Sequence, residues 1–209
     1  MSLRHRLFAA VYDTLLKPAE RRELAPRRAR LLAGLKGTVV DVGSGTGANL
    51  QYFRQAERVI LVEPDRFMRA RLGTRLGESS VPVEISDADA EHLPLADGTA
   101  DAVVFTLVLC SVPDQRLALL EARRVLKPGG TLAVLEHVRR QGRAGRWQDR
   151  LDGLWGRCVA PGCHINRNTV DAIVDTGFDF TEDSRFEAPA LALATPIIAG
   201  TAVAGPTVR

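Results

Sequence analysis

Cysteine is scarce in this chain, which has only Cys110, Cys158 and Cys163 among its 209 residues. A small, odd number of cysteines provides no disulfide framework, so the sequence predicts a protein of a reducing compartment, the cytoplasm. Cys158, Cys163 and His164 form a C-x4-C-H run, but a four-ligand zinc site would need a second pair of ligands with its own spacing. We therefore predict no metal site.

Aromatic residues are also few, at 5% of the chain, and the basic residues show no aromatic interleaving of the kind that stacks nucleic-acid bases. We predict no nucleic-acid partner. Residues 1–36 contain nine Lys or Arg and three Asp or Glu, a net charge of +6, whereas the whole chain carries +3. A solvated helical face accounts for this excess most simply, and peripheral contact of this basic segment with an acidic membrane surface is the alternative.

Long uninterrupted apolar helices are missing as well. The apolar stretch Leu7–Leu16 contains Asp13 and is far shorter than the roughly 20 residues that cross a bilayer. Residues 188–208 carry no charge, but three prolines and two glycines interrupt them. The segment PIIAGTAVAG is therefore expected to be a buried strand near the end of a sheet.

Alternating strands and helices dominate what is present. Strands are expected at 38–42, 58–62, 81–85, 102–109 and 131–136, with helices that begin at Ala48, Arg66 and, after the N-cap Asp114, at residue 115. Such alternation predicts a mostly parallel, doubly wound α/β sheet with right-handed crossovers. The chain is long enough for one domain, which we divide into an N-terminal helical cap (1–36), a cofactor-binding core (37–140) and an acceptor-side region that ends in an antiparallel hairpin (141–209).

Several boundaries follow from local signals. Pro18 and Pro26 are expected to break the N-terminal helices, and KPGG at 127–130 to form a turn. The region around Trp155 is expected to be loop-like, followed by a helix at 169–176, a strand at 178–186 and the final uncharged strand. The oligomeric state stays open.

The stretch TVVDVGSGTGANL carries the clearest functional signal, because a strand enters three closely spaced glycines, Gly43, Gly45 and Gly47. Glu63 follows about 20 residues later, where an acid can accept hydrogen bonds from two ribose hydroxyls. Both a nicotinamide dinucleotide and S-adenosylmethionine fit this much of the pattern.

Two acids favour S-adenosylmethionine. Asp41 places an anion just before the turn, where it would repel a pyrophosphate and attract a protonated amine. Asp89 and Ala90 offer a carboxylate and a backbone N–H to an adenine ring. Asp87 competes with Asp89 for that role, and we prefer Asp89 because the phrase D-A-E-x-L-P begins there.

The motifs VDVGSGTGANL, LVEPD, DAEHLP and VLKPGG, in this order, resemble those of class I S-adenosylmethionine-dependent methyltransferases, in the branch of the ubiquinone/menaquinone-biosynthesis enzymes. GSGTGAN, TLVLCSV, LEHV and GC-x-INRNT further resemble the thiol S-methyltransferase-like group. That group is typically membrane-attached through a longer hydrophobic N-terminal anchor, which this sequence lacks, so stable attachment is not expected.

This resemblance implies a Rossmann-like, seven-stranded sheet and a set of cofactor contacts. Backbone of Gly43, Gly45 and Gly47 would meet the methionine portion, Asp41 its amine, Glu63 the ribose, and Asp89 with Ala90 the adenine. Thr106 and Leu107 would touch the methionine chain or the adenine. The predicted cofactor site also includes Ser44, Asn49 and Pro64.

Catalysis by in-line displacement asks mainly for a well-placed nucleophile. His137, at the end of a strand beside Glu136, is the candidate base, with a structural role as the alternative. Cys110 is expected to pack the pocket, and His164 and Asn166 to reach over the acceptor. Tyr12 and the N-terminal segment would act as a lid, with a plain core-packing helix as the alternative. The favoured acceptor is a small lipophilic thiol, with phospholipid or quinone precursors, an NAD(P)-dependent oxidoreductase and a non-catalytic protein as alternatives.

Overall fold

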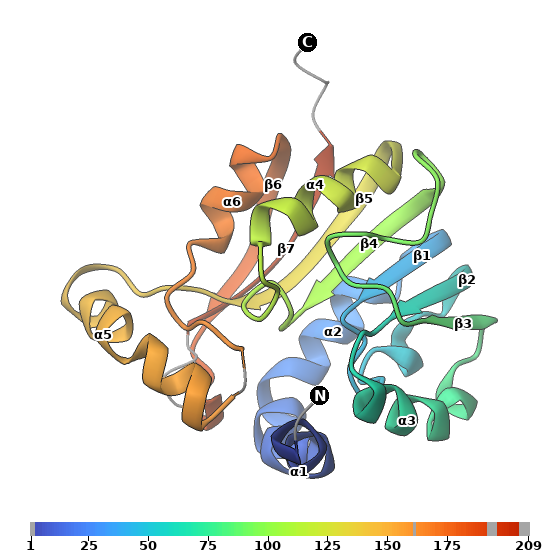
Figure 1. The fold of residues 1–209 in the computed structure, drawn as a ribbon. Helices are drawn as coiled ribbons and strands as arrows, with labels where there is room; N and C mark the ends of the chain where they lie inside the picture. Colours follow the sequence, from blue (N-terminus) through green and yellow to red (C-terminus); the bar gives the residue numbers. More distant parts are fainter. Residues whose placement is uncertain (1–2, 161, 192–195, 205–209) are drawn as a thin grey trace.

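The computed structural model describes residues 3–160, 162–191 and 196–204, and it places them around one seven-stranded sheet (Figure 1). The strand order is β3-β2-β1-β4-β5-β7-β6. The first five strands pair in parallel, and β7 is antiparallel to both β5 and β6. The predicted fold class is therefore confirmed. Their bounds are β1 Lys36–Val42, β2 Gln55–Val62, β3 Val83–Ser86, β4 Ala100–Thr106, β5 Leu126–His137, β6 Phe178–Phe186 and β7 Ile197–Ala204.

Helices cover both faces of the sheet and bury two separate apolar clusters. On one face, α4 (Gln115–Val125) and α6 (Thr169–Asp175) pack on side chains such as Val103 and Phe105. On the other, α2 (Ala25–Leu32) and α3 (Arg66–Thr74) pack on Val39, Leu61 and Val104. The central strands are buried on both sides, which explains their near-continuous apolar sequence.

Two further helices lie beyond the carboxyl ends of the parallel strands (Figure 1). These are α1 (Leu3–Ala19), at the N-terminus, and α5 (Gly142–Cys158), between β5 and α6. Ligands of doubly wound sheets bind at this edge, next to the point where the strand order reverses between β1 and β4. Both helices are thus placed beside the position where a cofactor would lie.

Several predicted elements are confirmed. Asp114 caps α4, because its carboxylate accepts hydrogen bonds from the backbone N–H groups of Arg116 and Leu117. The uncharged C-terminal segment forms β7, which pairs along its length with β5 and β6. The rest of that uncharged stretch, residues 192–195 and 205–208, lies outside the described residues.

The prediction of a helix that begins at Ala48 is wrong. The chain after Gly47 makes only a turn and the short 3-10 helix η2 (Leu50–Tyr52) before β2 begins at Gln55. Leu50 and Phe53 are both fully buried, so these anchors and the early start of β2 leave no length for an α-helix.

The loop expected around Trp155 is also wrong, because this region is the 17-residue helix α5. Leu151 and Trp155, one helical turn apart, pack against a small cluster of Cys110, Cys163 and Ile165. Tertiary packing of one face here outweighs the unfavourable helix propensity of the glycines in the segment.

The prolines and the KPGG segment also behave differently from the prediction. Pro18 lies inside α1, and Pro26 occupies the first turn of α2, where its missing N–H has no intrahelical partner to lose. A five-residue π-helix, η1 (Glu20–Leu24), joins the two helices. KPGG belongs to β5 as an irregularity in its pairing with β4, between the Ala100–Leu126 and Ala102–Thr131 pairs.

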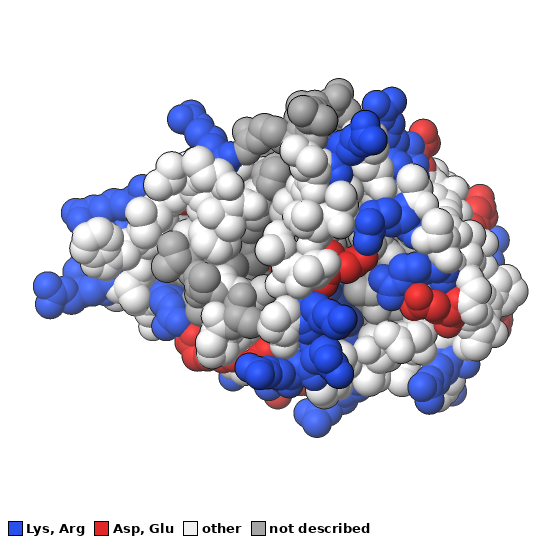
Figure 2. Space-filling view, turned by 90° about the horizontal axis from the view of Figure 1, so that it is seen from below, with Lys and Arg blue, Asp and Glu red and all other residues white. Residues whose placement is uncertain are grey.

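The basic N-terminal region does not produce a surface of one charge sign. Figure 2 shows the side on which Figure 1 places α1, where Lys and Arg groups lie among Asp and Glu groups and uncharged surface. Arg28 is 3% exposed and pairs with Glu20, while Arg27 lies over the Phe186 ring. In the described part of the chain, no helix combines the length and apolar character needed to cross a membrane.

Candidate functional site

The glycine turn (residues 43–47) follows the carboxyl end of β1 and forms one wall of a cavity of about 700 Å³. The backbone N–H groups of Gly43 and Ser44 both donate to the carbonyl of Val62, which ties the turn to β2. Gly43 has a φ of +66°, and a Cβ there would stand 2.5 Å from a methyl carbon of Val108. The turn therefore needs glycine both for its backbone conformation and for its closeness to the β4 end.

Asp41 is fully buried beneath this turn and has one unsatisfied oxygen. Its Oδ1 accepts a hydrogen bond of 2.7 Å from Asn49 Nδ2, whereas its Oδ2 has no partner among the described residues. Burial raises the pKa of Asp41 to about 6, although the Asn49 hydrogen bond and the charge of Arg28 act in the opposite direction. An orphaned carboxylate oxygen in this position fits a ligand that brings a cationic hydrogen-bond donor.

Asn49 connects Asp41 to the N-terminal helices. Its side-chain N–H groups donate to Asp41 and to Thr106 Oγ1, and its carbonyl oxygen accepts from Arg28 at 2.6 Å. Arg28 also pairs with Glu20. Sequence reasoning missed Arg28, because a basic residue in a basic helix gives no local sign that it is buried.

Glu63, at the end of β2, holds the glycine turn from the opposite side. Its two carboxylate oxygens accept from the backbone N–H groups of Gly45 and Asp65, each at 2.8 Å. Burial raises the pKa of Glu63, and these two hydrogen bonds oppose the shift. Glu63 and Pro64 both line the cavity, where the carboxylate could accept a pair of hydroxyl hydrogens.

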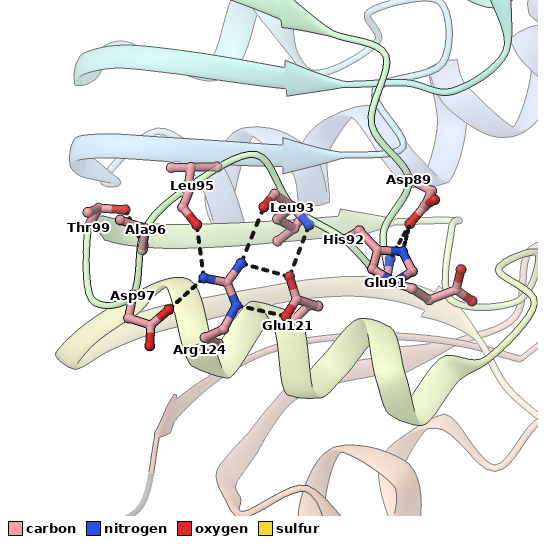
Figure 3. Close-up of polar contacts among 10 residues, drawn as sticks. All are labelled: Asp89, Glu91, His92, Leu93, Leu95, Ala96, Asp97, Thr99, Glu121 and Arg124. Atoms are coloured by element: carbon pink, nitrogen blue, oxygen red, sulfur yellow. Dashed lines mark hydrogen bonds and ion pairs between the residues drawn. The ribbon is translucent and has the colours of Figure 1, made fainter.

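The segment 89–99 contributes its first residues, Asp89 to Glu91, to the cavity wall. The segment is fastened to α4 through one arginine (Figure 3). The guanidinium of Arg124 donates to the carbonyls of Leu93 and Leu95 and to the carboxylates of Asp97 and Glu121. Glu121 in turn accepts from the Leu93 N–H at 3.0 Å. This network fixes the path of the segment that carries Asp89 and Ala90.

Asp89 and Ala90 both line the cavity, as predicted for an adenine site. Asp89 Oδ1 accepts from the N–H of Glu91 and lies 2.9 Å from His92 Nδ1 (Figure 3). Asp87, the competitor, is 81% exposed and faces a separate hollow with Arg69. The geometry therefore favours Asp89 over Asp87.

Helix α1 lines the outer side of the cavity, and its action as a lid stays a prediction. Asp13 on α1 accepts from Thr46 in the glycine turn and pairs with Arg71 on α3. His5 also contacts Asp65 at 2.9 Å. Tyr12 faces the cavity beside His5, and burial raises the pKa of its hydroxyl.

The remaining wall combines apolar side chains with two thiols and an imidazole. Cys110, His137 and Cys163 come from the turn after β4, the end of β5 and the loop after α5, and their ligand atoms lie within 4.8 Å of one another. His137 Nε2 is 3.2 Å from Cys163 Sγ. Apolar residues that pack on this cluster and also line the cavity are Trp155, Ala160 and Leu191.

The two thiols in this wall are not equivalent. A hydrogen bond to Cys163 raises the pKa of Cys110, with burial adding to the shift, and the same contact lowers the pKa of Cys163. Burial disfavours a charged His137, but the neighbouring Cys110 and the Glu136 carboxylate outweigh it and raise the pKa of His137. Burial also raises the pKa of Glu136 to about 6.

The predicted cofactor residues divide into two groups. Gly43, Gly45, Glu63, Pro64, Asp89, Ala90 and Leu107 line the cavity. Leu107 is the non-glycine residue with a positive φ, +60°, among the described residues, which marks the end of β4 as a strained position in the site.

The other predicted residues act behind the cavity surface. Ser44 donates to the Asp41 carbonyl, and Thr106 accepts from Asn49. Gly47 faces the core, since a Cβ there would stand 2.7 Å from Leu50 and 2.8 Å from Leu72. Their expected contacts with a cofactor stay predictions.

The predictions for the acceptor side agree less well with the structure. His164, expected to reach over the acceptor, pairs with Asp152 and is not among the cavity-lining residues. Cys158 is exposed and separate from Cys163. The motif GC-x-INRNT, which contains Cys163, could have marked this residue as part of the site. No local pattern links it to Cys110 and His137, which are distant in the chain.

Comparisons with known proteins agree with this geometry. Residues 40–134 match the family described as "Methyltransferase domain". The chain is 31% identical to human thiol S-methyltransferase TMT1A over 205 residues, which cover 94% of this chain and 82% of that protein. It is 33% identical to human thiol S-methyltransferase TMT1B, over 74% of this chain and 68% of the relative. Demethylmenaquinone methyltransferase of Thermobifida fusca is 41% identical over 47% of this chain and 42% of its own length.

Solved structures show the same fold at low identity. A possible histamine N-methyltransferase from Thermotoga maritima has a TM-score of 0.70 at 23% identity, with 95% of this chain and 96% of that chain covered. A structure described as a DhpI-SAH complex also has a TM-score of 0.70, at 22% identity, with 98% and 95% covered. These likenesses support the fold class and no specific acceptor.

Proposed function

The chain belongs to the family of S-adenosylmethionine-dependent methyltransferases, and from this premise we propose that it methylates a small lipophilic thiol. The observation that carries this proposal is the arrangement of one cavity. A glycine turn and a ribose-type acid line one side, with the orphan carboxylate of Asp41 buried beneath that turn, and two thiols and an imidazole line the other.

The donor side of the cavity suits S-adenosylmethionine. Asp41 Oδ2 would accept from the amine of its methionine portion, because this oxygen is buried and has no protein partner among the described residues. Glu63 would take the ribose hydroxyls, and Asp89 with Ala90 the adenine. When bound, this cofactor supplies an activated methyl group on a sulfonium.

The acceptor side suits an apolar molecule with one soft nucleophilic atom. Among the described residues on this side, none supplies a set of charged groups that would recognise a phosphate or a sugar, and His137 with the two cysteines forms the polar part. The two human relatives are named thiol S-methyltransferases, which supports a thiol over other small acceptors. A quinone precursor is the second candidate, because the Thermobifida fusca relative is a demethylmenaquinone methyltransferase.

The chain's own contribution to catalysis would be position and exclusion of water. Helix α1, tied to the glycine turn through Asp13 and Thr46, would hold the cavity closed. His137, the candidate base, lines the cavity beside the two cysteines. Its Nε2, however, already contacts Cys163 Sγ, so the imidazole would have to act together with that thiol.

Two measurements test this proposal. S-adenosylhomocysteine at saturating concentration should raise the melting temperature, as a ligand of the native state must, whereas NADH should not. A methyl-transfer screen with radiolabelled donor should then compare alkyl and aryl thiols, quinols and phosphatidylethanolamine vesicles. We expect methylated thiols as the main product.

The screen needs a variant with a weakened donor site, and Glu63→Gln serves for this. Glu57→Gln, at an exposed position of β2, is the matched control that keeps the donor site intact. Faster transfer to quinols than to every thiol tested would overturn the thiol proposal. Stabilisation by NADH alone would overturn the proposal of a methyl donor.

A further inference from the structure

We propose that Cys110, His137 and Cys163 form a three-ligand site for a zinc ion, with a fourth position that opens to the cavity and takes the sulfur of the acceptor. This departs from the absence of a metal predicted from sequence. It rests on the proposed thiol acceptor only for the identity of the fourth ligand.

The three ligand atoms have the separations that such a site needs. All lie within 4.8 Å of one another, and the His137 Nε2 to Cys163 Sγ distance is 3.2 Å. A tetrahedral zinc ion with bonds of about 2.3 Å to sulfur and about 2.0 Å to nitrogen separates its ligands by roughly 3.5–3.8 Å. Side-chain adjustments of about 1 Å or less would therefore bring all three atoms onto one ion.

Hydrogen bonds hold the two segments that carry the cysteine ligands in place without help from a metal. Arg167 donates to the carbonyls of Leu109 and Val112, on either side of Cys110. The N–H of His164, next to Cys163, donates to the Cys110 carbonyl at 2.8 Å. The two thiols are thus joined by a main-chain contact between the segments that carry them, which is the preorganisation that a metal site requires.

Charge also favours a divalent ion over free thiolates in this wall. Cys110 and Cys163 are 3% and 8% exposed, and His137 is 3% exposed. Two thiolates and one neutral imidazole around a dication carry no net charge, so burial costs the set far less than it costs a lone thiolate. Two cysteines, one histidine and an open position are a ligand set that catalytic zinc uses.

The open position lies on the side that matters for the reaction. All three residues line the same cavity as Gly43, Glu63 and Asp89. A thiol bound there exchanges its S–H bond for a zinc–sulfur bond, and its proton passes to water. The acceptor sulfur then uses a lone pair to form the new S–CH₃ bond, while the old C–S bond breaks and leaves its electron pair on the donor sulfur. Zinc keeps its charge and exchanges no electrons.

Metal content of the purified protein tests the site directly. After expression with zinc and dialysis against a weak chelator, we expect about one zinc per chain by mass spectrometry of the metal. Cys110→Ser, Cys163→Ser and His137→Gln should each lose most of it. Cys158→Ser and His164→Gln are the matched controls, since they alter a cysteine and a histidine close in sequence but outside the cluster, and they should retain it.

Cobalt in place of zinc provides a readout that does not depend on activity or on folding of the variants. The wild-type protein loaded with Co²⁺ should show a sulfur-to-cobalt charge-transfer band and the intense visible bands of a tetrahedral site. Addition of 2-mercaptoethanol should strengthen the charge-transfer band, because it adds a third sulfur. Addition of an alcohol of the same size should not.

The outcomes distinguish failure of the proposed zinc site from failure of the proposed thiol acceptor. Absence of stoichiometric zinc and of the cobalt spectrum, or a Cys110–Cys163 disulfide in the protein purified without reductant, would overturn the metal site and leave thiol methylation to be judged by the screen. A cobalt spectrum that no thiol changes would keep the metal but overturn its role in holding the acceptor. Equal zinc loss in Cys158→Ser and Cys163→Ser would also overturn the assignment of ligands.

Discussion

Asn49 Nδ2 donates to Asp41 Oδ1 at 2.7 Å, while Oδ2 of the same carboxylate is buried and has no partner among the described residues. The same asparagine accepts from Arg28, so the orientation of Asp41 depends on the N-terminal helices as well as on the glycine turn. Asp41 is thus held in a state that a cationic ligand would complete.

The first prediction concerns the pH dependence of donor binding. Because burial raises the pKa of Asp41 to about 6 in the free protein, a cationic ligand that needs the ionised carboxylate must displace a proton at lower pH. S-adenosylhomocysteine should therefore bind about tenfold more weakly at pH 5 than at pH 7. Calorimetric titration measures this, together with the protons released on binding.

Asp41→Asn is the variant that isolates this effect. It should bind roughly 10- to 100-fold more weakly at pH 7, because the amine loses a buried charged partner, and it should lose most of the difference between pH 5 and pH 7. A variant that kept the full tenfold difference would show that another group controls it.

The same shift affects the stability of the free protein. A raised carboxyl pKa contributes stability that is complete below the ordinary value near 3.8 and is lost as the pH rises through about 6. For Asp41 this amounts to roughly 3 kcal/mol between pH 4 and pH 7. The free energy of unfolding, measured with urea, should consequently fall less steeply from pH 4 to pH 7 in Asp41→Asn than in the wild type.

The second prediction concerns Glu63, whose two oxygens accept from Gly45 and Asp65. Glu63→Gln has one acceptor oxygen in place of two and should reduce the affinity for S-adenosylhomocysteine about 10- to 100-fold. A lower melting temperature should accompany this loss, since one backbone N–H of the turn region loses its partner. Glu57→Gln, on the same strand, should change neither quantity, and unchanged affinity in Glu63→Gln would remove Glu63 from the site.

The third prediction separates two glycines of the turn. Gly43→Ala would place a methyl group 2.5 Å from Val108, whereas the methyl group of Gly45→Ala would have the Gly43 carbonyl oxygen as its nearest neighbour, at 3.9 Å. Both have positive φ, so Gly45→Ala should lose about 1 kcal/mol of unfolding free energy, and Gly43→Ala at least about 2 kcal/mol more because of the clash.

A double variant checks the cause. Gly43→Ala combined with Val108→Ala removes the methyl groups that clash, so it should be more stable than the sum of the two single effects. Additive losses, measured by urea unfolding of the four proteins, would show that the strain at Gly43 does not involve Val108.

Local patterns in the sequence were enough to predict much of this architecture. The strand that runs into Gly43 and the cap at Asp114 each signal their structure within a few residues, and both are confirmed. Glu63 follows β2 and lines the cavity, and its contact with a ribose stays a prediction. The uncharged β7 was equally clear, because prolines and glycines argue against a membrane helix.

What the sequence did not reveal depends on contacts between distant segments. Arg28 lies 21 residues before Asn49, and Cys163 lies 26 residues after His137, so neither pair leaves a periodic or local signal. Helix α5 is another such case, since packing of Leu151 and Trp155 on the Cys110 cluster supports a helix that its glycines disfavour.

The last prediction concerns Arg124, which lies outside the cavity and is the residue that fastens the Asp89–Thr99 segment to α4 (Figure 3). Arg124→Met removes the donors to the Leu93 and Leu95 carbonyls while it keeps much of the side-chain length. Amide hydrogen exchange in this segment should become faster, because its opening no longer breaks charge-assisted hydrogen bonds. Affinity for S-adenosylhomocysteine should fall about three- to tenfold, because the adenine site must be ordered at the moment of binding.

Arg116, an exposed arginine on the same helix, provides the control, and Arg116→Met should behave as the wild type. Faster exchange without weaker binding would mean that Asp89 and Ala90 do not contact the ligand, and unchanged exchange would mean that Arg124 does not hold the segment.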